Sequence, residues 1–220
     1  MRDFLKKNKW TFIITSVIIL LPIAVGLLLW DKLPEQVPFH WGINGEVDGW
    51  ATKTQAVFLL PLFMLAMQWF CVLMTGLDPK AKNATESKLM GLVLWIIPVL
   101  NLFLHVMVWL QALGREVNMA VVMPLFMGAL FVIIGNYLPK CKQSYTIGIK
   151  LPWTLDDEEN WNKTHRLAGK LWVAGGLLCM PCALLSGVWS FIVMMSILVV
   201  MCAVPTVYSY QLYKKHNKEE

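Results

Sequence analysis

The sequence predicts an all-α, polytopic membrane protein with six transmembrane helices, and three observations support this fold class. First, six apolar stretches of about twenty residues recur along the chain, and a helix of that length crosses the hydrocarbon core of a bilayer. Second, the chain is 57% hydrophobic and only 15% charged, with a mean hydropathy of +0.58, whereas soluble domains average about 25% charged residues. Third, each stretch contains one proline, which membrane bundles tolerate because neighbouring helices satisfy the freed carbonyl groups. These prolines are Pro22, Pro61, Pro98, Pro124, Pro181 and Pro205.

The six spans are predicted, in chain order, at residues 10–30, 55–76, 89–113, 119–138, 167–187 and 189–210. Residues 1–118 then form an N-terminal three-span half and residues 119–220 a C-terminal three-span half, and we expect the two halves to form one compact membrane domain. The first and the fourth span are each followed by a long connection that opens with Leu-Pro, at residues 33–34 and 138–139. Since these connections lie on opposite sides of the membrane, they fit a weak 3+3 inverted repeat of the kind that transporters have.

The distribution of basic residues predicts that both termini are cytoplasmic. Six spans place the termini on one side, and that side carries all but three of the 19 lysines and arginines. The opposite side has only Lys32, Lys53 and Arg115, and cytoplasmic loops are the ones enriched in basic residues. This topology and the attraction of anionic lipid headgroups account for the net charge of +5. We therefore expect membrane lipids as partners and no direct contact with nucleic acid.

The first loop outside the membrane, residues 31–53, is predicted to contain a small β-hairpin. Apolar and polar residues alternate with a period of two in its first half, which is the pattern of a strand, and Asn44-Gly45 is a strong hairpin-turn pair. His40 and Asp48 would lie near the tip, and the register decides whether they face each other. The loop is interpreted as a recognition surface, a weak metal site or a rigid cap. A single histidine with scattered carboxylates is too little to predict a metal.

The connection between the fourth and fifth spans, residues 139–166, is predicted to lie in the cytoplasm and to contain the start of a helix. Pro152 would end any preceding helix, and Thr154 is a suitable N-cap with an acidic residue three positions later. Four acidic residues in a row would then occupy the first turn, where the helix dipole favours negative charge. We therefore expect a helix that starts directly after Thr154, carries Trp161 and His165 one turn apart, and continues into the fifth span.

Both loops resemble known sequence patterns. The cytoplasmic connection, hereafter the signature segment, is similar to the signature of the SdpI family of bacterial immunity proteins. The matching residues are Tyr145, Ile147, Gly148, Ile149, Pro152, Trp153, Thr154, Leu155, Trp161, Thr164 and His165. The outer loop resembles the membrane domain often found before that signature, through Pro34, Pro38, His40, Trp41, Gly45, Asp48, Trp50 and Lys53. Ser144, Lys150 and Leu151 depart from the signature, and lysine cannot make the bidentate contacts of the arginine expected at position 150.

The resemblance implies a polytopic protein of the bacterial plasma membrane with two tasks. Family members protect their cell from a secreted, membrane-active toxin peptide, and the founding member also recruits a cytoplasmic repressor to the membrane. Contact with a toxin or other ligand is expected at His40, Trp41, Asp48 and Trp50. Contact with a repressor-like partner is expected at Lys150, Pro152, Trp153, Thr154, Trp161 and His165.

Few polar residues lie inside the predicted spans. Three of them are candidate functional groups: Asn101, His105 and Asn136. Asn101 and His105 are four residues apart and share one helix face. Two interpretations stay open: these residues perform a function inside the membrane, or they form hydrogen bonds that join neighbouring helices.

The leading hypothesis is a non-enzymatic immunity and signalling protein that needs no cofactor and no metal. The sequence has no phosphate-binding loop, no His-Glu-x-x-His motif and no evident pair of nucleophile and base, which disfavours an enzyme. Three alternatives stay open. A small-molecule or ion transporter would use the kinked helices and the inverted repeat, a membrane-embedded enzyme would use His40, Asp48, His105 or His165, and a structural scaffold would need none of them.

Overall fold

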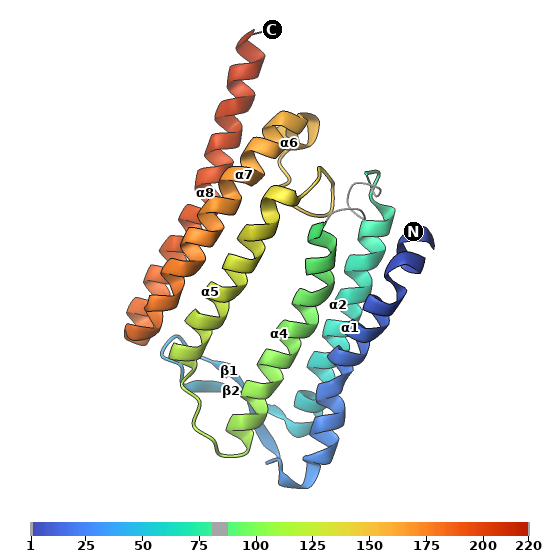
Figure 1. The fold of residues 1–220 in the computed structure, drawn as a ribbon. Helices are drawn as coiled ribbons and strands as arrows, with labels where there is room; N and C mark the ends of the chain where they lie inside the picture. The colour runs from blue at the N-terminus through green and yellow to red at the C-terminus, as the bar shows by residue number, and fades with distance from the viewer. Residues whose placement is uncertain (1, 81–87, 220) are drawn as a thin grey trace. The chain divides into compact units, whose positions relative to one another are not determined.

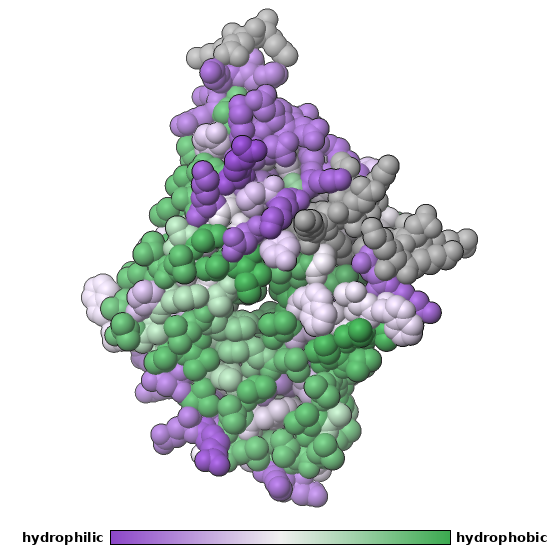
Figure 2. All heavy atoms as spheres, viewed as in Figure 1, coloured by the Kyte–Doolittle hydropathy of each residue, from purple (hydrophilic) through white to green (hydrophobic). Residues whose placement is uncertain are grey.

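The computed structural model describes residues 2–80 and 88–219 and is mostly helical (Figure 1). Six of the described helices are long and apolar enough to cross a membrane, which confirms the predicted number. They are α1 (Arg2–Leu28), α2 (Lys53–Leu77), α4 (Lys88–Ala112), α5 (Met119–Tyr137), α7 (Glu158–Cys179) and α8 (Gly187–Glu219). On the face shown in Figure 2, hydrophobic residues cover the middle of the helices and hydrophilic residues gather toward their ends, as expected for helices that cross a bilayer.

As predicted, a proline lies in each of the six spans, and in five of them it lies inside an α-helix. These five are Pro22, Pro61, Pro98, Pro124 and Pro205. Pro181 lies in the fifth span but outside its α-helix, because α7 ends at Cys179 and Pro181 belongs to the short 3-10 helix η3 (Met180–Leu184). Proline lacks the N–H that would continue the α-helix, and its ring clashes with the carbonyl group four residues before it. The fifth span therefore combines α7 with η3, and it begins at Glu158 instead of residue 167.

The chain divides into two compact units: unit 1 comprises residues 1–76 and 93–119, and unit 2 comprises residues 77–92 and 120–220. Unit 1 contains α1, the 3-10 helix η1 (Trp30–Lys32), a β-hairpin, α2 and most of α4. Its buried core lies where the hairpin meets the helices and consists of Leu33, Val37, Ala56, Val57, Val108 and Trp109. Since Val37 belongs to a strand and has no exposed surface, one side of the hairpin packs on the helices of unit 1.

The predicted hairpin is confirmed in unit 1. Strand β1 (Gln36–Trp41) pairs antiparallel with β2 (Val47–Thr52), and both lie near the C-terminal end of α4 in Figure 1. Gly45 in the turn has a φ of 80°, a conformation that the Asn-Gly pair adopts readily. α2 begins at Lys53, directly after β2. Lys53 also forms an ion pair with Glu35 at 2.8 Å, which closes the open end of the hairpin.

Unit 2 contains α5, the signature segment, α7 and α8. The short elements between them are η2 (Leu138–Lys140), α6 (Pro152–Asp156) and η3. Glycines let α5 and α7 approach closely. A Cβ at Gly128 would lie 2.6 Å from the carbonyl oxygen of Gly176, and one at Gly135 would lie 2.9 Å from that of Gly169. Small residues at such contacts are typical of helix packing in membranes, where burial from lipid gives no hydrophobic driving force.

The start of the fifth helix differs from the prediction. α6 begins at Pro152, whose fixed φ suits the first helical position, and Thr154 lies inside this short helix instead of capping a longer one. α7 starts directly after Asp157, whose Oδ1 accepts hydrogen bonds from the backbone N–H groups of Glu159 at 2.8 Å and Asn160 at 3.1 Å. Aspartate is a better N-cap than threonine, and the extended backbone of Asp157 separates the two helices.

Candidate functional site

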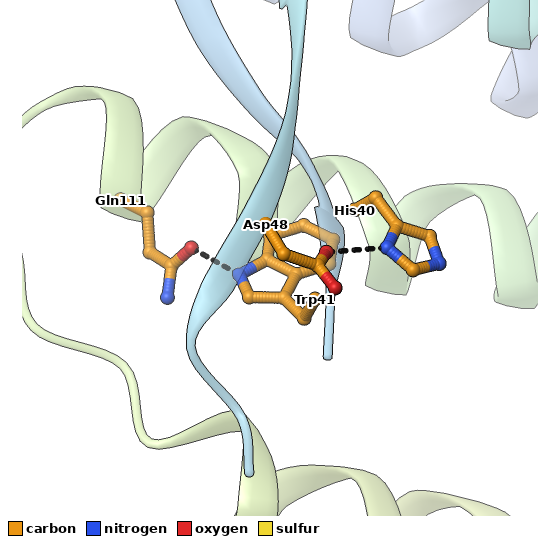
Figure 3. Close-up of polar contacts among 4 residues, drawn as sticks. All are labelled: His40, Trp41, Asp48 and Gln111. Carbon is orange, nitrogen blue, oxygen red and sulfur yellow. Dashed lines mark hydrogen bonds and ion pairs between the residues drawn. The ribbon is translucent and has the colours of Figure 1, made fainter. Parts of the chain in front are cut away.

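The exposed side of the hairpin carries a pair formed by His40 and Asp48 (Figure 3). The Nδ1 atom of His40 and Oδ1 of Asp48 are 2.5 Å apart, and the side chains are 74% and 53% exposed. They meet because the register is irregular on both sides of His40, which lies opposite Gly49. A Cβ at Gly49 would lie 2.8 Å from the Cβ of His40, so only glycine permits this approach. An exposed pair of this kind contributes little stability, and its side chains are accessible at the surface of the hairpin.

Trp41 ties the hairpin to α4. Its indole N–H donates to Oε1 of Gln111 at 2.6 Å (Figure 3). Gln111 lies in the last turn of α4, and its Nε2 donates to the carbonyl oxygen of Val117 at 3.0 Å. This role of Gln111 was not predicted from the sequence, because nothing local links a glutamine in a span to a tryptophan 70 residues earlier. Trp50, on β2, is 59% exposed.

The three polar residues predicted at membrane depth have different environments. Asn101 and His105 are buried on α4 and are joined to each other, since Nδ1 of His105 donates to the carbonyl oxygen of Asn101 at 2.8 Å. Nδ2 of Asn101 donates to the carbonyl oxygen of Ile19 on α1 at 2.9 Å. Asn136 on α5 is exposed, and its Nδ2 donates to Val132 of the same helix at 3.0 Å. The structure therefore links Asn101 to His105, whereas the bond described for Asn136 stays within α5.

Trp161 and His165 lie one turn apart on α7, as predicted, and both are buried. Their rings stack with centroids 4.0 Å apart. Nδ1 of His165 donates to the carbonyl oxygen of Trp161 at 2.8 Å, so Nε2 is the acceptor for the N–H of Ile149 at 2.8 Å. The indole N–H of Trp161 donates to the carbonyl oxygen of Cys141 at 2.8 Å. These bonds hold residues 141–149 of the signature segment against the start of α7, and they occupy every ring nitrogen of Trp161 and His165.

Gly148 lies against these two rings and has a φ of 118°. A Cβ at this position would lie 2.7 Å both from Nε2 of His165 and from the ring of Trp161. Residues with a side chain are sterically excluded from such positive φ values. Backbone conformation and close packing therefore both require glycine at this position of the signature.

Trp153 joins the signature segment to the end of α8. Its indole N–H donates to Oγ of Ser209 at 2.9 Å, and its ring stacks on Tyr213 with centroids 5.9 Å apart. Asn160 on α7 reaches the same residue, since its Nδ2 donates to the carbonyl oxygen of Ser209 at 2.9 Å. Thr154 is fully buried, and its hydroxyl group bonds to the backbone of the same segment.

Asp78 is a residue of this site that the sequence did not reveal. It follows α2, belongs to unit 2 and is 6% exposed. Its Oδ2 accepts hydrogen bonds from the backbone N–H groups of Tyr145 and Thr146, both at 2.9 Å, and Oδ1 accepts the N–H of Lys80 at 2.7 Å. Nζ of Lys80 in turn donates to the side chain of Gln143. No local pattern predicts this arrangement, because the carboxylate binds backbone groups 67 and 68 residues later.

Cys141 lies in the core of the signature segment beside Trp161. Its side chain is 3% exposed, and its Sγ contacts the carbonyl oxygen of Ile147 at 3.5 Å. Burial raises the pKa of the Cys141 thiol to about 12. The thiol is therefore protonated at physiological pH and packs as a small apolar side chain.

The residues expected to bind a partner thus fall into two groups. Thr154, Trp161 and His165 are buried, whereas Lys150 and Pro152 are exposed and Trp153 is half-buried. A shallow polar depression of about 140 Å³ opens between the start of α7 and the end of α8. It is lined by Asp157, Glu159, Asn160, Lys163, Leu212, Lys215 and His216. No group of three or more His, Cys, Asp or Glu side chains that could hold a metal ion occurs in residues 2–80 and 88–219.

Comparison with known proteins agrees with this arrangement. Residues 140–209, from the signature segment into α8, match the SdpI/YfhL protein family. Residues 17–65, which include the hairpin, match a domain of unknown function (DUF1648). In its C-terminal part the chain is therefore similar to the SdpI/YfhL family, and its six long apolar helices are consistent with a polytopic membrane protein.

The relative found by sequence comparison is the immunity protein SdpI of Bacillus subtilis (strain 168). The two sequences are 29% identical over 217 residues, which cover 97% of this chain and 99% of the relative. The chain is therefore a distant homologue of that protein over nearly its full length. No solved structure matches the chain.

Proposed function

We propose that this chain is an immunity protein of the bacterial plasma membrane that protects its cell from a secreted, membrane-active toxin peptide. The near-complete alignment with the B. subtilis immunity protein supports this role, because it includes both the hairpin and the signature segment. The proposed role is non-enzymatic and requires neither a cofactor nor a metal. Protection at the membrane also suits a chain that consists mostly of apolar helices.

The hairpin is the proposed contact surface for the toxin, on the outer side of the membrane. His40 and Asp48 offer a donor and a carboxylate on an exposed surface, and Trp50 offers an exposed aromatic ring. Aromatic and charged groups are frequent anchors at small interfaces. Trp41 contributes by holding the hairpin to α4 through Gln111, so its proposed role is to position the surface and not to form it.

The signature segment is the proposed contact surface for a cytoplasmic, repressor-like protein. Lys150 and Pro152 are exposed and the ring of Trp153 is partly accessible, and these three residues are close in sequence. Thr154, Trp161 and His165 support this surface from the interior, because their polar atoms bond within unit 2. In this proposal the buried group maintains the shape of the segment, and the exposed group performs the recognition.

The proposed orientation predicts the accessibility of engineered cysteines. A membrane-impermeant maleimide added to intact cells should modify Glu46→Cys in the exposed hairpin turn and spare Asn162→Cys on the exposed side of α7. The unaltered chain, with its five native cysteines, measures the background. After the cells are permeabilised, both variants should react. Modification of only the Asn162→Cys variant in intact cells would reverse the orientation and exclude the hairpin as a toxin-facing surface.

The immunity hypothesis predicts that expression of the chain lets a sensitive bacterium survive a membrane-permeabilising peptide toxin. His40→Ala or Asp48→Ala should reduce survival while the amount of protein in the membrane stays constant, because an exposed pair contributes only about 0–1 kcal/mol to stability. Glu46→Ala, on the same hairpin, is the matched control and should protect fully. Equal survival with all three variants would mean that the hairpin only covers the helices. A wild-type chain that gives no survival would refute the function itself.

A further inference from the structure

Unit 1 contains a row of buried polar atoms at membrane depth that the proposed function does not use. Asn101, His105 and Trp109 follow one another at intervals of four residues on α4, so they lie on one face of the helix. Their exposed fractions are 0%, 2% and 6%. Oδ1 of Asn101, Nε2 of His105 and Nε1 of Trp109 have no hydrogen-bond partner among the described residues. Oε1 of Gln68 on α2, whose side chain is 1% exposed, is a fourth such atom.

The bonds that these side chains do form show which of the remaining atoms are acceptors. Nδ2 of Asn101 donates to Ile19 at 2.9 Å, and Nε2 of Gln68 donates to Oγ1 of Thr15 at 2.7 Å, so the amide oxygens remain. Nδ1 of His105 lies 2.8 Å from the carbonyl oxygen of Asn101 and can donate to it. In that tautomer Nε2 of the neutral ring is an acceptor, and the backbone of Ala56 on α2 lies near the same ring. In that tautomer the set has three acceptors and one donor, the indole N–H of Trp109. The hydroxyl oxygen of Ser16 on α1 is a fifth atom without a partner among the described residues, and the hydroxyl group can act as either.

We propose that this face of α4 binds water inside the membrane-spanning part of unit 1. A ligand for three acceptors and one donor must mainly donate hydrogen bonds, which excludes an anion. A protonated amine would need a carboxylate to offset its desolvation, and α2 and α4 contain no acidic residue. Water donates two hydrogen bonds, accepts others, and commonly satisfies buried polar groups in proteins. Lipid chains cannot do so, because the hydrocarbon region offers no hydrogen-bonding group.

Water at this site also affects the chemistry available to His105. The rings of His105 and Trp109 have centroids 5.6 Å apart, so both can contact the same small group of water molecules. An imidazole in contact with water can exchange protons, whereas one enclosed by apolar side chains cannot. The site would therefore allow His105 to exchange a proton at membrane depth.

Hydroxyl-radical footprinting in ¹⁸O-labelled water tests the proposal on the full-length chain in lipid nanodiscs. Radicals form from water and label side chains beside bound water, even where bulk solvent is excluded. Trp109 should be labelled several-fold faster than Trp161, which is also buried but whose indole N–H is satisfied by Cys141. This comparison uses the unaltered chain, so it does not depend on how any variant folds. Equal labelling of the two tryptophans would overturn the proposal.

Two variants then locate the water. Asn101→Leu and His105→Phe remove an acceptor without adding a polar group, and each should lower the labelling of Trp109 toward that of Trp161. Asn136→Leu is the matched control, because Asn136 is exposed on α5 and bonds only to its own helix in the described structure; it should leave the labelling unchanged. If labelling of Trp109 persists in both α4 variants while their helical content is unchanged, the water lies elsewhere and the assignment to this face of α4 is wrong.

Discussion

Gly148→Ala is expected to destabilise unit 2 strongly, because it combines a steric clash with an unfavourable backbone conformation. The new Cβ would lie 2.7 Å from both the imidazole of His165 and the ring of Trp161, and alanine would have to adopt a φ of 118°. The backbone strain costs about 1–3 kcal/mol and the overpacking about 1–3 kcal/mol. The expected sum is a loss of roughly 2–6 kcal/mol, measured as a lower unfolding temperature of the purified protein by tryptophan fluorescence.

Alanine substitutions at two other glycines distinguish the contribution of backbone strain from that of overpacking. Gly114 also has a positive φ, at 77°, but a Cβ there would meet nothing within 4 Å, so Gly114→Ala should show only the cost of the backbone conformation. Gly91 has neither feature, so Gly91→Ala should be nearly neutral. The three variants should therefore form a graded series. If Gly148→Ala is no less stable than Gly114→Ala, the packing of the signature segment against Trp161 and His165 is not as described.

Lys150→Ala is expected to abolish recruitment of a repressor-like protein to the membrane and to leave toxin protection unchanged. The Lys150 side chain is exposed, and the contact described for it is a 3.4 Å bond to the carbonyl oxygen of Thr146, so its loss should not disturb the fold. Trp153→Ala should impair both activities, because it removes the bond to Ser209 and the stacking on Tyr213. Truncation of a packed tryptophan costs about 3 kcal/mol. Co-purification of the partner with membranes and survival under toxin measure the two activities.

Two controls make this comparison specific. Lys170→Ala removes an exposed positive charge elsewhere on α7 and should leave recruitment intact. Trp153→Phe keeps an aromatic ring against Tyr213 and should recover most of the protection that Trp153→Ala loses. If Lys150→Ala removes protection as well as recruitment at normal membrane levels, the two activities share one site. If it affects neither, the partner surface lies outside the signature segment.

The elements whose signals are local could be predicted from the sequence. Long apolar stretches gave the six helices, and the alternating residues with Asn44-Gly45 gave the hairpin. The contact between His40 and Asp48 could not be derived, because it depends on an irregular register that the alternation of residue types does not encode. A one-residue change in pairing moves a side chain to the opposite face of a strand.

The sequence-based predictions were wrong where two residues could both cap the same helix. They were incomplete where a side chain binds a group that is far away in the sequence. Thr154 and Asp157 are both suitable N-caps, and the preference of Pro152 for the first helical position decided that Asp157 caps α7. Asp78 has no local signal at all, because its carboxylate binds the backbone of a loop that is far away in sequence. Which residues of the signature segment are buried could not be predicted either, because a sequence motif does not show which of its residues face the interior.

Burial of Cys141 gives the signature segment a built-in chemical probe. The thiolate is the form that attacks an alkylating reagent, and a thiol with a pKa of about 12 is almost never ionised at neutral pH. Its sulfur is enclosed with Trp161 in the core of the segment, so a reagent can reach it only when the segment opens. The rate at which iodoacetamide modifies Cys141 therefore reports how often the segment leaves its closed conformation, without the introduction of any label.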